Sequence, residues 1–400
     1  MPGITYSPAS QLMAVSSRCL RVMLKPAKHI ALVIVNLRPG IDGAATAMLE
    51  LMPYVRALGY ETTIFNFLTG DPRHRAMMAA RLTSKGFGPT DCQEDFYRYR
   101  EGEIDCRLYF LPFSIKEIGV KHPAIFQKII ETLKTEPLDY LLTVDRFSVF
   151  AGYLLGKPGC HFFHSLANIQ EATIMHPAYV NVLRGRDVAA VSGFLQIKVK
   201  ELLGIEATVI NPGINFPNYI VPRAAAADAI GFYAGGYPAY KGDEVVNIII
   251  EKMPERRFII VGRGYAHDFA RFPANVSYLG FQHDMKTFYR HLKLVLVPSL
   301  VLEGFARIIL EAAANGIPAI ASNIGGIPEA LQDSGILIDV DPPQQPNIPR
   351  LAEGYIKEIR RLFHNTAEYE ALSAKARLRA RQYAAQLEEV LGSFLRQHIP

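Results

Sequence analysis

The sequence predicts an α/β protein with two doubly wound, Rossmann-like domains that face a central cleft. Short apolar runs alternate with helical segments in both halves of the chain, as expected for parallel sheets covered by helices. Several of these runs end in glycine loops, and sheets of this kind bind ligands at the carboxyl ends of their strands. The length of 400 residues also exceeds a single ordinary hydrophobic core.

The first domain is predicted over residues 29–216. An apolar run at 29–37, a glycine loop at 38–43 and a helix at 44–58 lead to a strand at 61–67, which is the start of a βαβ unit. Further strands are expected around Leu108, at 140–144, at 160–164, at 187–192 and from 208 onward. Residues 71–107 have an irregular pattern and balanced charges, which indicates a solvated insertion.

The second domain is predicted over residues 230–400, after a linker at 217–229 that is rich in proline and alanine. Its strands are expected at 230–234, 257–261, 276–280, 294–297, 319–322 and 335–338. Helical periodicity then fills 350 to about 396 with breaks, and these last helices are candidates to cross back to the first domain.

Residues 1–28 are basic and are expected to lie outside both domains. Four basic residues occur there, and no acid precedes Asp42. Pro2, Gly3 and Pro8 oppose a helix, so a flexible extension is the preferred interpretation. The alternatives are a targeting peptide or a peripheral contact with the inner face of a membrane.

Composition sets only loose limits on function. The formal net charge of +5 does not indicate a nucleic-acid partner. The four cysteines are irregularly spaced, with no cluster of the zinc type, so a reduced cytoplasmic setting is expected. No apolar run reaches the ~20 residues that a membrane-spanning helix needs.

Two glutamates flank the start of a predicted helix. The apolar run at 294–297 stops at Pro298, and helical periodicity runs from about 306 to 315. Because Glu303 precedes this helix, it is expected to face the crevice at the helix N-terminus. Glu311 lies among apolar residues and therefore needs a hydrogen-bonding partner, for which a pair of sugar hydroxyls is one candidate.

Several motifs, in this order, resemble retaining glycosyltransferases of the GT-B fold, family 4 type, over about residues 29–340. The segment from Glu303 to Glu311 resembles the family signature of two glutamates separated by seven residues, and Ser322 to Glu329 fits the sequence that follows it. The loop 235–242 resembles the phosphate-binding loop. Further matching positions are Gly43, His164, the turn 211–215 and Gly262.

The resemblance implies transfer of a sugar from a nucleotide diphosphate donor, of UDP or GDP type, to an acceptor hydroxyl with retention of configuration. It assigns donor binding to Gly43, Gly235, Lys241, Gly262, Glu303, Gly304, Phe305, Ala306, Ile308 and Glu311. It assigns catalysis to Lys241, Glu303 and His164, and it implies no protein nucleophile. In these roles Glu311 binds the ribose, and Lys241 neutralises the pyrophosphate as charge develops on it.

Each of these roles has a purely structural alternative. A lone histidine at a strand end is often structural, Lys241 could be a surface lysine, and Glu311 could be an acid favoured by the helix dipole. The loop glycines could serve a tight turn alone. No cofactor and no metal are expected, because Asp339 and Asp341 run into two prolines and indicate a surface turn.

One position departs from the family pattern. Gly236 stands where the family usually has a phosphate-binding arginine, and Arg263, Arg307 or Arg38 are candidates to replace it. A catalytically inactive nucleotide-sugar-binding partner subunit is therefore an alternative, as is a sugar-nucleotide epimerase of the same fold. The acceptor is open among a glycan, a lipid-linked intermediate and a small molecule, in polysaccharide, lipopolysaccharide or other glycoconjugate synthesis.

Overall fold

The computed structural model describes residues 28–35, 43–84, 86, 88, 91–93, 95–112, 122–174, 177–222, 224, 227–265, 273–341 and 346–399. Three expectations lie outside the described residues. They concern the basic extension at 1–27, the loop at 36–42 with Arg38, and the Pro342-Pro343 turn.

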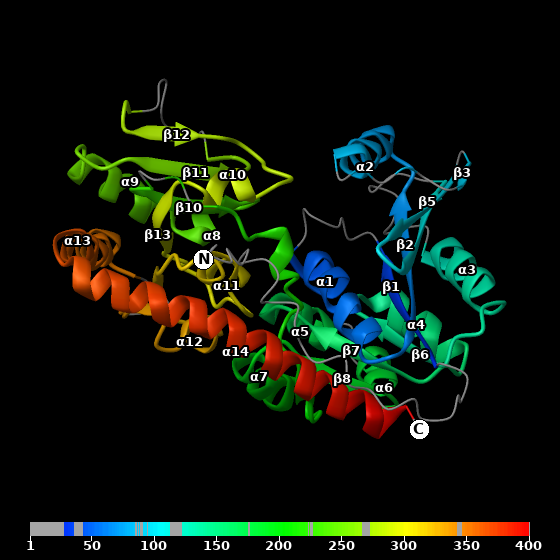
Figure 1. The fold of residues 1–400 in the computed structure, drawn as a ribbon. Coiled ribbons are helices and arrows are strands. Elements are labelled where there is room, and N and C mark those ends of the chain that lie inside the picture. Colours follow the sequence, from blue (N-terminus) through cyan, green and yellow to red (C-terminus); the bar gives the residue numbers. More distant parts are fainter. Residues whose placement is uncertain are drawn as a thin grey trace, which may run out of the picture.

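The described residues form two sheets, one in each half of the chain (Figure 1). The first sheet has the strand order β3-β4-β5-β2-β1-β6-β7-β8-β9, and the second has the order β12-β11-β10-β13-β14-β15. Strand pairing is parallel apart from the β3–β4 and β4–β5 pairs, which are antiparallel. The predicted α/β class with two doubly wound sheets is confirmed.

The strands of the first sheet are β1 (His29–Val35), β2 (Glu61–Thr69), β3 (Asp91–Gln93), β4 (Phe96–Glu101), β5 (Ile104–Leu111), β6 (Tyr140–Thr143), β7 (Gly159–Phe163), β8 (Asp187–Ala190) and β9 (Thr208–Val209). Those of the second sheet are β10 (Ala229–Gly235), β11 (Phe258–Gly262), β12 (Val276–Tyr278), β13 (Leu292–Val297), β14 (Ala319–Ser322) and β15 (Gly335–Ile338).

The helices of the first half are α1 (Gly43–Ala57), α2 (Pro72–Ser84), α3 (His122–Leu133), α4 (Arg146–Leu154), α5 (Leu166–Ile174), α6 (Ala178–Arg184) and α7 (Gly193–Leu203), followed by the 3-10 turn η2 (Phe216–Asn218). Those of the second half are α8 (Pro238–Lys241), α9 (Asp243–Lys252), α10 (Lys286–Tyr289), α11 (Arg307–Ala313), α12 (Ile327–Leu331), α13 (Ile348–His364) and α14 (Thr366–His398).

Strand β1 lies inside the first sheet because both of its faces are apolar. Residues 30–35 are at most 3% exposed. Ile30, Leu32 and Ile34 pack in the same core cluster as α1, whereas Ala31 and Val33 pack in a second cluster with α3 and α4. Since β2 and β6 flank β1 on opposite sides, the carboxyl ends of these strands form a switch point, where open α/β sheets place ligands.

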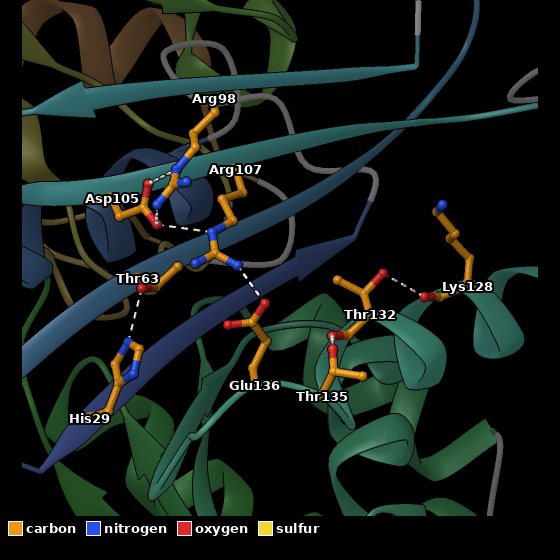
Figure 2. Close-up of polar contacts among 9 residues, drawn as sticks. All are labelled: His29, Thr63, Arg98, Asp105, Arg107, Lys128, Thr132, Thr135 and Glu136. Carbon is orange, nitrogen blue, oxygen red and sulfur yellow. Dashed lines mark hydrogen bonds and ion pairs between the residues drawn. The ribbon is translucent and has the colours of Figure 1, made fainter. Parts of the chain in front are cut away.

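The described residues of 71–107 are mostly regular, which corrects the irregular pattern expected there, whereas β3 is exposed throughout, as expected for a solvated segment. The segment forms α2 and an antiparallel extension of the sheet through β3 and β4. Some of its charges pair: Asp105 accepts from Arg98 at 2.8 Å and from Arg107 at 2.9 Å, and Arg107 also donates to Glu136, which follows α3, at 2.5 Å (Figure 2). Charged residues at exposed positions of β4 interrupt the apolar alternation that is typical of a strand.

Helix α14 runs from the second sheet back along the first half of the molecule, as Figure 1 shows in red. Its N-cap is Asn365, whose side chain accepts from the backbone N–H of Glu368 at 3.1 Å. The Tyr383 hydroxyl donates to the carbonyl of Pro212 at 2.5 Å, and α14 packs on α1. Among the described helices, none combines the length and the apolar character needed to cross a bilayer.

The expected linker at 217–229 is partly packed. The Val221 N–H donates to the Asn315 side chain at 2.9 Å, and Asn315 donates in turn to the Tyr219 carbonyl at 3.0 Å. The change of sheet falls between β9 and β10. The exact domain boundaries stay a prediction.

Candidate functional site

Two glycines shape the carboxyl ends of neighbouring strands in the second sheet. Gly235 ends β10 with φ of 64°, and Gly262 ends β11 with φ of 125°. A Cβ at Gly262 would lie 2.7 Å from the Gly235 nitrogen, so a side chain there would force the two strand ends apart. Both positions therefore need glycine, and they leave room beside them for Lys241.

Lys241 and Glu303 meet at the ends of β10 and β13. Lys241 forms an ion pair with Glu303, and the Ser299 hydroxyl donates to the same carboxylate at 2.6 Å. The Lys241 side chain is 31% exposed and that of Glu303 is 13% exposed. The structure thus brings together two residues that the resemblance assigns to catalysis, and the Lys241 side chain keeps part of its surface accessible.

His164 comes to the same place from the first sheet. It follows β7, and a Cβ at Gly304 would lie 2.1 Å from the His164 carbonyl oxygen. Gly304 therefore permits the two halves of the molecule to approach each other beside Glu303. Burial, and then the charge of Arg307, lower the pKa of His164 to about 3, so the imidazole is neutral at physiological pH.

The His164 Nε2 atom is buried and has no hydrogen-bond partner among the described residues. Buried polar atoms usually have such a partner, so this atom is available to a polar group of a ligand. The ring also stacks on Phe162 at 6.3 Å between centroids, which is the structural role that a strand-end histidine can have.

Glu311 lies deeper, inside α11, and is only 8% exposed. The Tyr289 hydroxyl donates to its Oε2 at 2.7 Å, and the guanidinium of Arg307 lies 3.4 Å from its Oε1. Burial raises the pKa of the Glu311 carboxyl, and Arg307 opposes that shift. The buried acid thus has partners within the protein, and its role in ribose binding stays a prediction.

The other residues that the resemblance assigns to donor binding lie at the start of α11 and at the start of α1. Ala306 precedes α11 and is buried, Ile308 is half-buried, and the Phe305 ring packs against Tyr383 of α14 at 5.9 Å. Gly43 begins α1 with no described atom within 4 Å of a Cβ built on it. Described contacts give no steric reason for glycine at position 43, so its approach to a phosphate stays a prediction.

Sequence reasoning missed the residues that join the two halves. Glu50 on α1 forms a 2.5 Å ion pair with Arg307 of the other half. Glu329 on α12 accepts from the Gly193 N–H and from the Asn211 side chain, both at 2.7 Å. A signal for Glu50 existed, because it stands among buried apolar residues of α1, and a carboxylate on such a face requires a partner.

The three arginines that could replace the family arginine at position 236 differ in their surroundings. Arg307 is committed to Glu50, and Arg38 lies outside the described residues. Arg263 is exposed next to Gly262, its N–H donates to the Gly235 carbonyl at 2.7 Å, and its guanidinium lies 4.5 Å from the Phe281 ring centroid. Arg263 is therefore the candidate that borders the strand ends of the site.

The second half of the chain is similar in sequence to known glycosyl transferases. Residues 233–361 match the family described as "Glycosyl transferases group 1". A D-inositol 3-phosphate glycosyltransferase of Mycobacterium sp. (strain KMS) is 29% identical over 157 residues, which are 33% of this chain and 35% of that protein. A namesake from Thermobispora bispora is 26% identical over 238 residues, 48% of this chain and 55% of that protein. The chain thus spans about a third to a half of the length of these relatives.

Solved structures match nearly the whole chain. Sucrose-phosphate synthase from Thermosynechococcus elongatus has a TM-score of 0.67 at 19% identity, over 92% of this chain and 98% of that one. Anabaena HepE in complex with UDP and glucose has a TM-score of 0.69 at 16% identity, over 91% of this chain and 98% of that one. The chain has the GT-B fold. In this GT-B chain, Lys241, Glu303 and His164 lie where strand ends of the two sheets meet.

Proposed function

We propose that the protein is a retaining glycosyltransferase, of family 4 type, that moves a hexose from a nucleotide diphosphate sugar to an acceptor hydroxyl. The observation that carries the proposal is the meeting of Lys241 and Glu303 with His164 across Gly304. The group 1 glycosyl transferase domain at 233–361 supports the same reaction class.

Lys241 supplies the main electrostatic contribution. Negative charge develops on the departing nucleotide diphosphate, and a positioned ammonium stabilises that charge more than the ground state. Its pairing with Glu303 and Ser299 holds the ammonium at the strand ends before the donor binds. On binding, the diphosphate replaces part of this contact, and Glu303 turns its free oxygen toward the sugar hydroxyls.

His164 acts as a neutral hydrogen-bonding group. With a pKa of about 3, the imidazole does not serve as a general acid near neutral pH. Its buried Nε2 atom contacts a hydroxyl of the donor sugar or of the acceptor. Retention proceeds without a protein nucleophile.

The donor is of UDP type, with GDP as the alternative. One GT-B neighbour supports UDP, because Anabaena HepE was solved with UDP and with UDP-glucose. Arg263 takes the place of the phosphate-binding arginine that the family usually has at the position of Gly236. The substitution Arg263→Gln should therefore lower turnover more than the substitution of a nearby surface residue. The acceptor is a glycan, a lipid-linked intermediate or a small molecule.

The function is tested first by binding. Thermal unfolding is measured with UDP, GDP, ADP and their sugars, and selective stabilisation by one nucleotide is expected. No stabilisation by any of them would remove the proposal. A transfer assay in the presence of a chelator then follows the anomeric proton of the product by NMR, and a product with inverted configuration would refute retention.

The same assay separates catalysis from a binding subunit. The observation that favours the second candidate is Gly236, because a leaving diphosphate with one cation fewer departs more slowly. Nucleotide binding without hydrolysis or transfer across several acceptor classes would favour the binding subunit. Loss of activity in the chelator that manganese restores would contradict the expected independence of metal.

A further inference from the structure

One guanidinium serves two carboxylates in the region between the two halves. Arg307 on α11 lies 2.5 Å from Glu50 on α1 and 3.4 Å from Glu311 one turn further along α11. The three side chains are each only 11% exposed. With both acids ionised, this buried cluster carries one excess negative charge.

The carboxylates of Glu50 and Glu311 differ in the number of hydrogen bonds that they accept. Glu50 also accepts from the Tyr219 hydroxyl at 2.7 Å and from the Asn215 N–H at 3.1 Å. Among the described residues, Glu311 accepts from Tyr289 alone at normal hydrogen-bond distance, and its Oε1 has only the long contact with Arg307. An ionised carboxylate has about four acceptor positions, so Glu311 retains capacity for further donors.

Keeping Glu311 costs stability. A buried carboxylate without full compensation is unfavourable, and burial raises its pKa, whereas Arg307 holds it down. Titratable or charged groups reach this cluster from every element around it: Glu50 from α1, His164 after β7, Tyr219 after η2, Tyr233 from β10, Tyr289 from α10 and Tyr383 from α14. An acid that destabilises the fold and keeps free acceptor positions has the character of a ligand-binding group.

We infer that Arg307 is a positioning residue that keeps Glu311 ionised for a ligand diol and ties it to Glu50 on the opposite half of the molecule. The diol is the ribose of the nucleotide, so this part rests on the proposed function. Arg307 does not touch the donor. It couples recognition of the donor by α11 to the approach of the two halves.

The first arm of the test needs no ligand. Unfolding of the wild type, Arg307→Gln, Glu311→Gln and the double variant is measured from pH 4.5 to 8.5. A raised pKa of Glu311 means that its stabilising contribution is present below its unfolded pKa and is lost as pH rises through the folded value. Glu311→Gln is therefore expected to match the wild type at pH 4.5 and to exceed its midpoint at pH 8. Arg307→Gln should destabilise increasingly with pH, and less so in the Glu311→Gln background, where the lost pair with Glu50 still contributes.

The second arm measures UDP binding by calorimetry across pH 6 to 8.5. Arg307→Gln should bind UDP at least tenfold more weakly at pH 6.5 and recover toward pH 8.5, as Glu311 loses its proton. Arg307→Lys should restore most of the affinity, because it keeps the charge. Glu329→Gln is the matched control, since Glu329 also joins the halves but lies outside this cluster, and its binding should stay within about threefold of the wild type.

Two results would overturn the inference. One is equal destabilisation by Arg307→Gln with and without Glu311 at every pH. The other is equal weakening of UDP binding by Arg307→Gln and Glu329→Gln with an unchanged pH profile, which would make Arg307 an ordinary contact between the halves. If the wild type binds no nucleotide, the proposed function is wrong, and so is the role of Glu311 in ribose binding. The first arm still decides whether Arg307 keeps Glu311 ionised.

Discussion

Lys241 and Glu303 form an ion pair that is partly open to solvent, and such pairs contribute little to folding, about 0–1 kcal/mol. The pair therefore matters for chemistry more than for stability. Lys241→Ala is expected to lower kcat by about 10²- to 10³-fold, the range seen when one positioned group that stabilises transition-state charge is removed. Turnover and thermal unfolding of this variant check the prediction.

Lys198→Ala is the control, because Lys198 pairs with Glu201 on the exposed face of α7. It should change neither turnover nor the unfolding midpoint. A Lys241→Ala enzyme with normal kcat would show that the diphosphate is neutralised elsewhere.

His164 should make stability depend on pH. Its folded pKa of about 3 lies below the unfolded value of ~6.5, so stability is full above that value and is lost as pH falls toward the folded pKa. His164→Asn should reduce the slope of unfolding free energy between pH 6.5 and 4 by up to about 1.4 kcal/mol per pH unit. Denaturant titrations at several pH values measure it.

A slope identical in the wild type and in His164→Asn would mean that His164 is protonated in the folded protein.

Between elements, the turn before α11 approaches the end of β7 only because Gly304 has no side chain. Gly304→Ala would place a Cβ 2.1 Å from the His164 carbonyl oxygen. Overpacking of this kind costs about 1–3 kcal/mol and should separate the two sheets' strand ends, so both unfolding free energy and turnover are expected to fall.

Gly43→Ala is the matched glycine change, because a Cβ there meets no described atom within 4 Å. Its stability should stay within about 0.5 kcal/mol of the wild type. A loss of donor affinity without a loss of stability in this variant would support the predicted approach of the Gly43 backbone to the phosphate.

Helix α14 is anchored on the first half by the bond from Tyr383 to the Pro212 carbonyl. Tyr383→Phe keeps the ring contact with Phe305 and removes the hydrogen bond, leaving a buried carbonyl without that donor. The expected loss is about 1–3 kcal/mol in denaturant unfolding. Tyr153→Phe on the exposed surface of α4 should be neutral, and equal effects of the two changes would argue against anchoring by α14.

At the scale of the molecule, the halves are joined by Glu50 with Arg307, by Glu329 with Asn211, and by α14. These buried contacts predict a single cooperative unfolding transition in calorimetry, although the chain has two sheets. UDP at about 100 times its dissociation constant should add about 2.7 kcal/mol to the whole transition. Two separated transitions, with UDP raising only one, would show that the halves fold independently.

Much of the architecture was readable from the sequence because it depends on local patterns. The apolar run that became β1 and the periodicity that became α7 identify elements without reference to the rest of the chain. The pattern failed at 96–101, where charged residues cover one face of β4 and their partners lie on β5. Those partners are close in space, and the local pattern did not reveal the pairing.

The sequence by itself determined the fold class, the glycine loops and the residue types of the site, since strand ends, turns and spacing follow from short-range preferences. Only the tertiary structure decided which charges meet. Lys241 pairs with Glu303, which lies 62 positions away in the sequence. Arg307 pairs with Glu50, which lies 257 positions away. Electrostatic partners depend on distance through space and on burial, and neither quantity is fixed by spacing along the chain.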